Sequence, residues 1–277
     1  MKVAYQGEPG AFSEIACENL FPDQTTLPCK TFRDVFEALQ NGLCEVAVLP
    51  VENSLAGSVH ENYDLILEYP NLHIISETQV HVSHYLLGIE SASLKTIKTV
   101  LSHPQALMQS AAFLDSYPEW NRQPFYDTAG SAAYVAQKGD ESIAAIASKR
   151  AAERYGLKIL AAAIETNHHN YTRFFALAPK SYPAKIPINK ASIVFTLGQE
   201  IGSLARVLTK IAEAGFSLIK LESRPIHGRP WQYMFYADME LHGALDNFED
   251  LIKLLPDFAG DLRVLGTYHS DLFIAPS

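Results

Sequence analysis

The sequence predicts an α/β protein in two parts, a mostly parallel α/β module followed by a smaller ferredoxin-like domain. Three observations predict this class: β-rich runs alternate with helical patterns over residues 1–182, a proline-rich stretch follows, and six further elements occur in the order βαββαβ. With 277 residues, 48% of them hydrophobic, the chain is long enough for about two domains with complete cores.

Strand and helix patterns alternate along the first module. Residues 3–5 have strand composition, and the apolar residues after them have helical spacing. Residues 31–34 resemble a helix-capping sequence, with Asp where Glu is usual, and the helix that they open leads to an apolar strand at 46–49. The same order recurs in the strands 99–101, 124–126 and 143–146, followed by helices that begin at Pro104, near Thr128 and at Ser148. Functional loops are expected at the C-terminal ends of these strands.

A linker is expected at residues 178–187, which hold three prolines within nine residues and show no amphipathic period. The elements expected beyond it are a strand at 192–197, a helix at 202–214, strands at 216–223 and 231–240, a helix at 244–255 and a strand at 262–268. This order is that of the ferredoxin-like fold.

Charge and hydropathy exclude several classes of protein. The net charge is −9, and Lys and Arg are scattered singly, so a nucleic-acid partner is not expected. No stretch approaches the roughly 18 apolar residues of a membrane span, and the first residues lead directly into a strand, so we expect a cytoplasmic protein without a membrane partner.

Metal and hydrolase sites are not expected either. The three cysteines lack CxxC spacing and lie in apolar segments, which predicts free thiols. His168 and His169 are adjacent, while His81 and His84 are odd-spaced in a predicted strand, so neither pair shares one face and no zinc site is predicted. No serine has a Gly-x-Ser-x-Gly context.

Polar residues follow two of the predicted strands. Glu52, Asn53 and Ser54 come after the strand at 46–49 and offer an acid–base group, an amide and a hydroxyl, although an ordinary capped loop explains them equally well. Ser102 ends another strand, and Gln105 and Gln109 share a face if Pro104 opens a helix.

Thr172 and Arg173 enter the apolar run 174–177 at the edge of a core strand. A threonine in a strand needs no functional explanation. A buried arginine, however, requires a carboxylate partner, supplied either by the protein or by a ligand.

Together these motifs resemble the prephenate dehydratase family across essentially the whole chain. The matching segments are GEPGAFS (7–13), PVENS (50–54), GSV (57–59), SHPQ (102–105), DTA (127–129) with SA (131–132), AAIAS (144–148), NYTRF (170–174) and ESRP (222–225). The resemblance implies a catalytic module at 1–182, with two lobes around a cleft as in type II periplasmic binding proteins, and an ACT regulatory domain at 190–277.

The resemblance also implies the activity and its residues. The family converts prephenate to phenylpyruvate in phenylalanine biosynthesis and needs no metal or cofactor. Thr172 takes the place of its central catalytic residue. The resemblance carries the substrate-binding role over to Glu52, Asn53, Ser102, Gln105 and Gln109. From their chemistry and position we also expect Ser54, Thr128 and Arg173 to bind substrate, with Arg173 holding the pyruvyl carboxylate.

L-phenylalanine is the effector that the resemblance implies, acting on the ACT domain of a homodimer or homotetramer. The expected effector-binding residues are Gly202, Ser203, Leu204, Ser217, Glu222, Ser223, Arg224 and Pro225. The turn at Gly202 and the ESRP segment are expected on adjacent strands, where both can reach one ligand. The family often has a GAL-type turn and an asparagine at the positions of Gly202–Leu204 and Ser217, so weaker phenylalanine binding is predicted.

Two other functions remain open on the sequence. An arogenate dehydratase would carry the same motifs and accommodate an ammonium in place of the ketone. A catalytically silent amino-acid sensor would keep the cleft and the ACT domain, but the intact Thr172-Arg173-Phe174 motif argues against it.

Overall fold

The chain folds into two compact units, each described here by itself. The computed structural model describes residues 1–179, 182, 187–198, 200–226, 228–270 and 272. The first unit comprises Met1–Glu68 and Thr78–Ala176, and the second comprises Tyr69–Glu77 and Leu177–Ser277. Strands β5 (Leu72–His81) and β11 (Tyr171–Pro179) therefore belong partly to each unit. The linker expected at 178–187 lies partly outside the described residues, and its first two residues are the end of β11.

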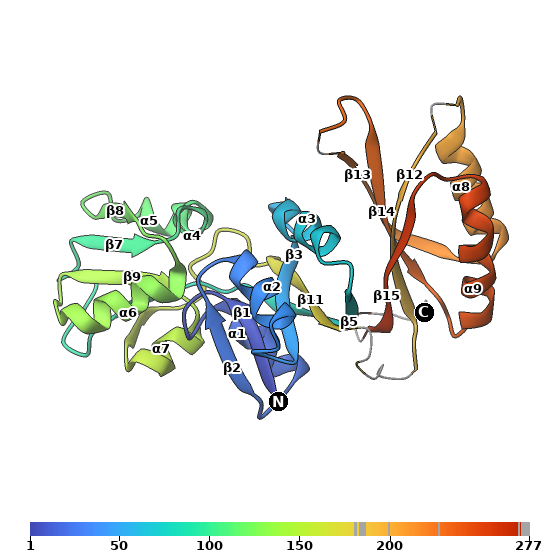
Figure 1. The fold of residues 1–277 in the computed structure, drawn as a ribbon. Coiled ribbons are helices and arrows are strands. Elements are labelled where there is room, and N and C mark those ends of the chain that lie inside the picture. Colours follow the sequence, from blue (N-terminus) through green and yellow to red (C-terminus); the bar gives the residue numbers. More distant parts are fainter. Residues whose placement is uncertain (180–181, 183–186, 199, 227, 271, 273–277) are drawn as a thin grey trace. The chain divides into compact units, whose positions relative to one another are not determined.

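The first unit contains a sheet built around the N-terminal strand (Figure 1). In this sheet β11, β3, β1 and β2 follow one another, and β1 is parallel to both of its neighbours. The bounds of its elements are β1 (Lys2–Gln6), α1 (Phe12–Leu20), β2 (Thr25–Cys29), α2 (Phe32–Gln40), β3 (Val46–Asn53), β4 (Gly57–Ser58) and α3 (His60–Glu68). The capping sequence at 31–34 is confirmed, because the Thr31 hydroxyl accepts from the Asp34 N–H and the Asp34 carboxylate accepts from the Thr31 N–H.

A second sheet forms the other lobe of this unit, with α4 and α5 on one face and α6 on the other (Figure 1). Its strand order is β10, β6, β9, β7 and β8, and β7 is parallel to both of its neighbours. The bounds of its elements are β6 (Tyr85–Gly88), β7 (Thr99–Ser102), α4 (Pro104–Gln109), α5 (Ala111–Leu114), β8 (Asn121–Pro124), α6 (Thr128–Lys138), β9 (Ile143–Ala147), α7 (Lys149–Tyr155) and β10 (Lys158–Ala161).

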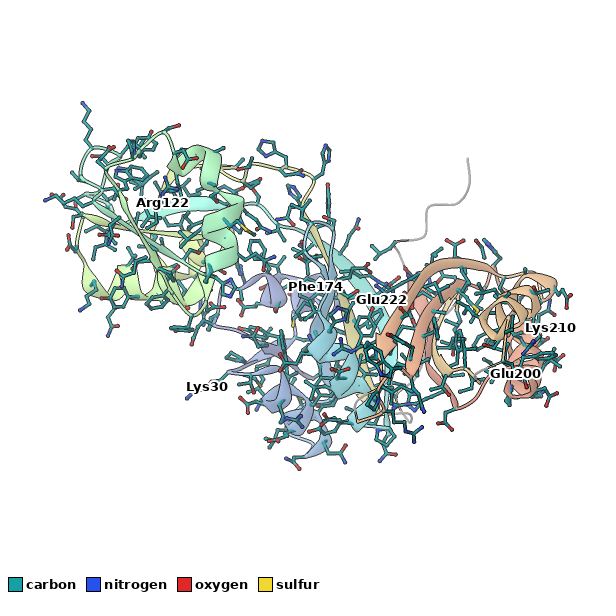
Figure 2. The ribbon with its side chains drawn as sticks, turned by 90° about the horizontal axis from the view of Figure 1, so that it is seen from above. Lys30, Arg122, Phe174, Glu200, Lys210 and Glu222 are labelled. Atoms are coloured by element: carbon teal, nitrogen blue, oxygen red, sulfur yellow. The ribbon has the colours of Figure 1, made fainter. Side chains whose placement is uncertain are left out.

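The strand expected at 124–126 is wrong in position, since β8 ends at Pro124. Pairing with β7 sets its place, and all four of its residues are exposed, so apolar patterning could not locate it. Buried and charged residues of the first unit are separated as the sequence predicts. Phe174 lies inside this unit, while the singly scattered charges, such as Lys30 and Arg122, lie at its surface (Figure 2).

Two chain segments connect the lobes of the first unit. Residues 82–84 follow β5, and residues 162–170 precede β11. The buried carboxylate of Glu165 joins them, because it accepts from the Ser83 hydroxyl (3.0 Å) and from the His84 N–H (2.8 Å). Burial by itself would raise the pKa of Glu165, but these and other hydrogen bonds to its carboxylate outweigh burial and hold the pKa below its usual value. The Val82 N–H also donates to the carbonyl of Asn170 (2.8 Å). These hydrogen bonds hold the two connecting segments, 82–84 and 162–170, to each other.

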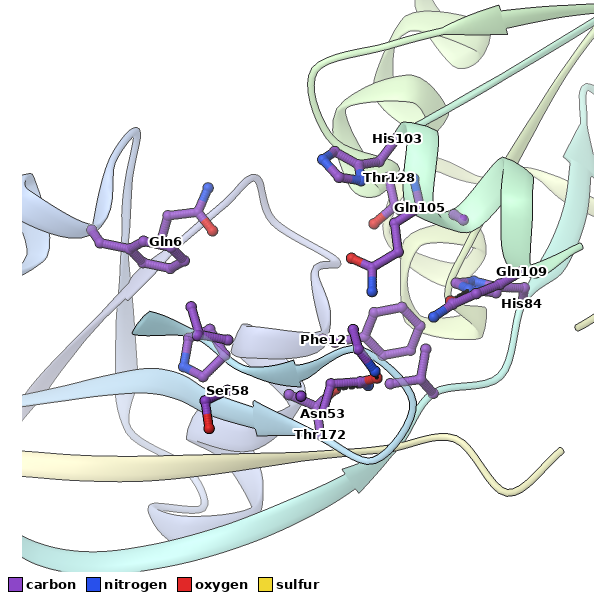
Figure 3. Close-up of a pocket in the computed structure, with 17 residues that line it drawn as sticks. Gln6, Phe12, Asn53, Ser58, His84, His103, Gln105, Gln109, Thr128 and Thr172 are labelled. Carbon is purple, nitrogen blue, oxygen red and sulfur yellow. Dashed lines mark hydrogen bonds between the residues drawn. The ribbon is translucent and has the colours of Figure 1, made fainter. Parts of the chain in front are cut away.

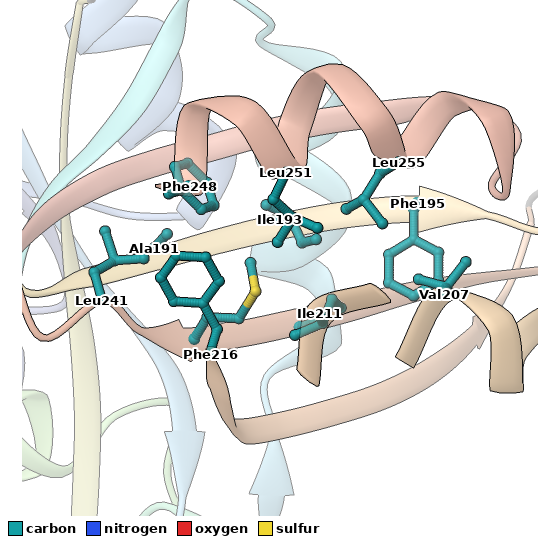
Figure 4. Packing of buried hydrophobic residues seen from close by; sticks show 12 residues of the cluster. Ala191, Ile193, Phe195, Val207, Ile211, Phe216, Leu241, Phe248, Leu251 and Leu255 are labelled. Atoms are coloured by element: carbon teal, nitrogen blue, oxygen red, sulfur yellow. The ribbon is translucent and has the colours of Figure 1, made fainter. Parts of the chain in front are cut away.

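The second unit has the expected βαββαβ order. Its elements are β12 (Lys190–Thr196), α8 (Ser203–Glu213), β13 (Ser217–Pro225), β14 (Tyr233–Glu240), α9 (Leu245–Leu254), a 3-10 turn (Leu255–Asp257) and β15 (Leu262–Ser270). Both helices pack against one face of the sheet, where Val207 of α8 and Phe248 of α9 belong to one buried apolar cluster with Ile193 and Phe195 of β12 (Figure 4). The strand order is β13, β14, β12 and β15, followed by the part of β5 that belongs to this unit.

One expectation about this sheet is wrong. The strands that carry the Gly202 turn and the ESRP segment, β12 and β13, are not adjacent, because β14 lies between them and pairs with both. A split βαβ unit leaves room for such an inserted strand. The two segments nevertheless lie at the same end of the sheet, since Thr196 and Arg224 are both aligned with Met234.

Candidate active site

A cavity of about 420 Å³ lies within the first unit, among residues of both lobes and of the segments that connect them (Figure 3). Its polar lining consists of Gln6, Asn53, Ser58, His84, His103, Gln105, Gln109, Thr128 and Thr172. Its apolar lining consists of Phe12, Phe32, Pro50, Ala56, Gly57, Val59, Val82 and Ala106. None of these described residues is an Asp, Glu, Lys or Arg, so the lining presents neutral groups and histidines.

Asn53 holds the hydroxyl oxygen of Thr172. Its Oδ1 accepts from the backbone N–H groups of Leu55 (3.0 Å) and Ala56 (2.9 Å), which fixes the orientation of the amide. Its Nδ2 then donates to Thr172 Oγ1 (2.9 Å) and to Asn170 Oδ1 (2.8 Å). Because Nδ2 has no lone pair to offer, the Thr172 hydroxyl is an acceptor in this contact and keeps its own proton for another partner.

Arg173 lies on the other side of β11 from Thr172, as neighbouring strand residues must. It does not line the cavity. Its guanidinium is 3.6 Å from the Glu52 carboxylate and 4.6 Å from the centre of the Phe175 ring. The carboxylate partner that the sequence requires for Arg173 is thus supplied by the protein. Glu52, also expected to bind substrate, does not line the cavity either.

Two expected serines also have structural partners outside the cavity lining. Ser54 fastens its loop to β11, since its hydroxyl donates to the carbonyl of His169 (3.0 Å) and accepts from the Tyr171 N–H (2.9 Å). Ser102 is fully buried and donates to the carbonyl of Ile146 (2.6 Å). Neither side chain is placed toward the cavity in this conformation.

The glutamines expected on one helix face do share the cavity. Pro104 opens α4 as expected, and the N-terminal end of the helix is capped by His103 Nδ1, which accepts from the Gln105 N–H (3.2 Å). Gln105 and Gln109 both line the cavity. Gln109 Oε1 lies 2.9 Å from Nε2 of the buried His84.

Thr128 reaches the cavity from the first turn of α6. Asp127 caps this helix by accepting from the Gly130 N–H (2.7 Å). Burial, and after it the nearby Glu8, raises the pKa of Asp127. The first turn of α6 therefore brings the Thr128 hydroxyl to the cavity that Gln105 also lines, while the Gly130 N–H is taken up by Asp127.

Several lining residues were not expected from the sequence. Phe12 has helical spacing typical of a core residue, and Phe32 lies in the first turn of an amphipathic helix. From the sequence, His84 was considered only as a zinc ligand. Among the described residues there is no group of three or more His, Cys, Asp or Glu side chains that could hold a metal ion. Gln6 adjoins the matching segment at 7–13, and Ser58 and His103 lie inside those at 57–59 and 102–105, which is the signal that could have found them.

The expected effector residues form two groups in the second unit. Gly202 has a left-handed backbone (φ 79°) at the start of α8, next to Ser203 and Leu204. Glu222 to Pro225 end β13 at the same end of the sheet, whereas Ser217 begins that strand. Nine residues of strand span roughly 26 Å, so Ser217 and Pro225 of one chain are far apart.

Comparison with known proteins identifies the family of this chain. Residues 3–182 match the family model described as prephenate dehydratase. Arogenate dehydratase 4, chloroplastic, of Arabidopsis thaliana is 40% identical over 98% of this chain and 68% of its own length. A prephenate dehydratase of Arthrobacter aurescens, solved in complex with L-Phe, has a TM-score of 0.87 and 28% identity over 97% of this chain and 89% of that one.

A further solved structure is described as GqqA, a novel type of quorum quenching acylase. It has a TM-score of 0.87 and 33% identity over 99% of both chains. No helix in the described part of the chain is long and apolar enough to span a membrane.

Proposed function

The chain belongs to the prephenate dehydratase family of lyases, and we propose that it converts prephenate to phenylpyruvate, with Thr172 as the catalytic residue. The observation that carries this proposal is the contact between Asn53 Nδ2 and Thr172 Oγ1 (2.9 Å). It leaves the hydroxyl proton of Thr172 available to a ligand in the cavity.

The reaction suits such a donor. Prephenate loses its ring carboxylate as carbon dioxide, the bonding electrons enter the ring, and the hydroxyl at the opposite carbon departs as the ring becomes aromatic. Thr172 donates a hydrogen bond to that oxygen, which departs as hydroxide with the electron pair of the C–O bond. An oriented donor in a site shielded from water stabilises the developing negative charge without reorganisation of solvent.

The substrate dianion is held by neutral donors in this proposal. The described lining residues include no Lys or Arg, but Gln105, Gln109 and Thr128 line the cavity and can donate hydrogen bonds. Glu52 and Arg173 support the site through their own contact behind β11. Ser54 and Ser102 do so by fixing the loop after β3 and the end of β7.

The neutral lining also favours prephenate over arogenate. Arogenate carries an ammonium where prephenate has a ketone, and no carboxylate among the described lining residues could pair with it. A relative is named an arogenate dehydratase, so both substrates belong in the test.

The deciding experiment incubates the purified protein with prephenate and, separately, with arogenate, and identifies the products by chromatography. We expect phenylpyruvate as the major product, with a kcat/KM at least about tenfold higher for prephenate, as expected when a cationic group lacks its partner. A higher value for arogenate would reverse the assignment. A chelator should leave the rate unchanged, since no metal or cofactor is proposed.

A second candidate is an acylase activity, favoured by the whole-length similarity to GqqA. It would use a cavity hydroxyl as nucleophile. An acylated quorum-sensing signal belongs in the same assay, because its hydrolysis in the absence of prephenate turnover would select this function. A silent sensor would show neither activity.

Regulation by L-phenylalanine is proposed for the second unit as an ACT domain at about 190–277. It is supported by the βαββαβ order and by the relative solved with L-Phe. Gly202 and the ESRP segment lie at one end of the sheet, but Ser217 lies at the other. A site that contains all of them requires residues from two copies, consistent with the proposed homodimer or homotetramer. A cytoplasmic location is also a proposal, and the Arabidopsis relative is named as chloroplastic.

A further inference from the structure

His84 is a buried cavity residue whose ring has one polar partner among the described residues. Only 2% of the residue is exposed, and its Nε2 lies 2.9 Å from Gln109 Oε1. Its Nδ1 is buried and has no hydrogen-bond partner in the described part of the chain. The ring of Phe12 packs edge-on against it, with centroids 5.9 Å apart. Within the part of the chain that the structure describes, the contact with Gln109 is therefore the one hydrogen bond that the ring makes.

The backbone of His84 is held independently of any ligand. Its N–H donates to Glu165 Oε2 (2.8 Å), and its carbonyl accepts from the Ile164 N–H (3.0 Å). The carbonyl of Gln109 likewise accepts from the Thr166 N–H (2.7 Å). Both ends of the contact are thus fixed to the same connecting segment, 162–170.

The position of the imidazole proton follows from this geometry. A proton on Nδ1 would leave a buried donor without an acceptor, whereas a proton on Nε2 is used by Gln109 Oε1 and leaves only a bare lone pair at Nδ1. Buried N–H groups without partners are rarer than under-used acceptors. Burial also lowers the pKa of His84, which favours the neutral ring.

The proton on Nε2 determines what Gln109 offers to the cavity. With Oε1 engaged by His84, the NH2 group of Gln109 points into the cavity (Figure 3). An amide turned the other way would present an oxygen to an anionic ligand. The choice matters because the described lining contains no Lys or Arg to compensate.

We propose that His84 is a positioning residue, which holds the Gln109 amide with its NH2 group toward the cavity so that it donates to an oxygen of the substrate. This inference rests on the proposed function for the identity of the substrate. It does not require His84 to touch the reacting atoms.

A double-mutant cycle tests the coupling. His84→Leu should lower kcat/KM for prephenate roughly 10- to 100-fold, mainly through KM, as the loss of a hydrogen bond to a charged ligand does. Gln109→Ala should cost a similar factor, and the double variant should lose little more than either single variant. Losses that multiply would show that His84 acts independently of Gln109, which would overturn the proposal.

Two further variants separate positioning from general structural damage. His84→Gln places an amide N–H near the position of Nε2 and should recover most of the activity. His81→Leu is the matched control, because His81 ends β5 three residues before His84 and its Nε2 contacts the carbonyl of His168 (2.7 Å), away from the cavity lining. It should keep kcat/KM within about twofold, as most exposed substitutions do. Equal losses in His81→Leu and His84→Leu would contradict the proposal.

A spectroscopic measurement does not depend on turnover. Two-bond ¹H–¹⁵N correlation of the histidine rings in the ligand-free protein at neutral pH should show His84 neutral and protonated on Nε2. A proton on Nδ1, or a doubly protonated ring, would overturn the inference even if prephenate is the substrate. Failure of the wild-type enzyme to convert prephenate would instead refute the proposed function and leave this readout to decide the role of His84.

Discussion

The cavity of the first unit and the polar cluster buried in the second unit differ in whether they contain charged side chains. The described cavity lining contains amides, hydroxyls and histidines, but no Asp, Glu, Lys or Arg. In the second unit Lys190 Nζ lies 2.6 Å from Glu77 Oε1, with 9% and 0% of the two side chains exposed, and Ser270 also donates to Glu77. Charges that satisfy each other are not available to a ligand, whereas neutral donors with fixed orientation are.

The difference has an energetic reason. A buried ion costs several kcal/mol in lost hydration, which only close partners offset. Glu77 and Lys190 meet that condition within the protein. The Asn53 amide and the Thr172 hydroxyl are neutral and need no ionic partner within the protein. In this site the charge arrives with the substrate when it binds. The comparison predicts that changes in the cavity alter turnover, while changes in the cluster alter stability.

The largest expected effect is on turnover. Thr172→Ala should lower kcat by roughly two to four orders of magnitude, because it removes a positioned donor to the leaving hydroxyl. Thr172→Ser keeps the hydroxyl and should retain much more activity. Steady-state kinetics on prephenate measures both, with circular dichroism as the check on folding. A folded Ala variant with nearly wild-type activity would show that the assignment is wrong.

Next in size is the effect of breaking the charged cluster. Lys190→Met should lower the free energy of unfolding by about 3–5 kcal/mol, because it leaves the Glu77 carboxylate buried without its cation. Urea unfolding followed by circular dichroism measures the loss. The double variant Lys190→Met with Glu77→Leu should recover much of it. No difference in stability between wild type and Lys190→Met would remove the contrast between the two regions.

Asn53→Asp sharpens the assignment of donor and acceptor in the cavity. The new carboxylate can still accept from the N–H groups of Leu55 and Ala56, but it accepts the Thr172 proton instead of donating to Thr172 Oγ1. We therefore expect kcat to fall roughly 10- to 1,000-fold, the range for one misdirected catalytic hydrogen bond. Kinetics at neutral pH tests this, and an unchanged rate would mean that the Thr172 proton does not act on the substrate.

The smallest expected effect concerns the second unit. Ser217→Asn should tighten L-phenylalanine binding by about 1 kcal/mol, because it adds an amide able to hold the ligand's amino group. Calorimetry on the full-length protein compares the two forms. Binding that is equally tight in both would show that Ser217 does not contact the effector, and no binding to either would remove the sensing role of the unit.

Much of the fold was predictable from local signals. The capping box at Thr31, the helix opened by Pro104 and the apolar strand at 46–49 each depend on neighbouring residues, and the structure confirms them. The exposed strand β8 was misplaced because its position depends on pairing with β7. The insertion of β14 between β12 and β13 was missed for the same reason, since strand order is not written in any local pattern.

The candidate site shows the same division. The motifs by themselves identified the family and placed Thr172, Asn53, Gln105, Gln109 and Thr128 among the candidates, because a motif records which residue types the chemistry needs. Only the tertiary structure decided which of the candidates share a cavity. In the folded chain Arg173 lies beside Glu52, and the Ser102 hydroxyl donates to a backbone carbonyl. His84, from a segment distant in sequence, lies against Gln109. The physical reason is that side-chain direction depends on which face of each strand is covered and on partners far away in the chain, neither of which a short segment encodes.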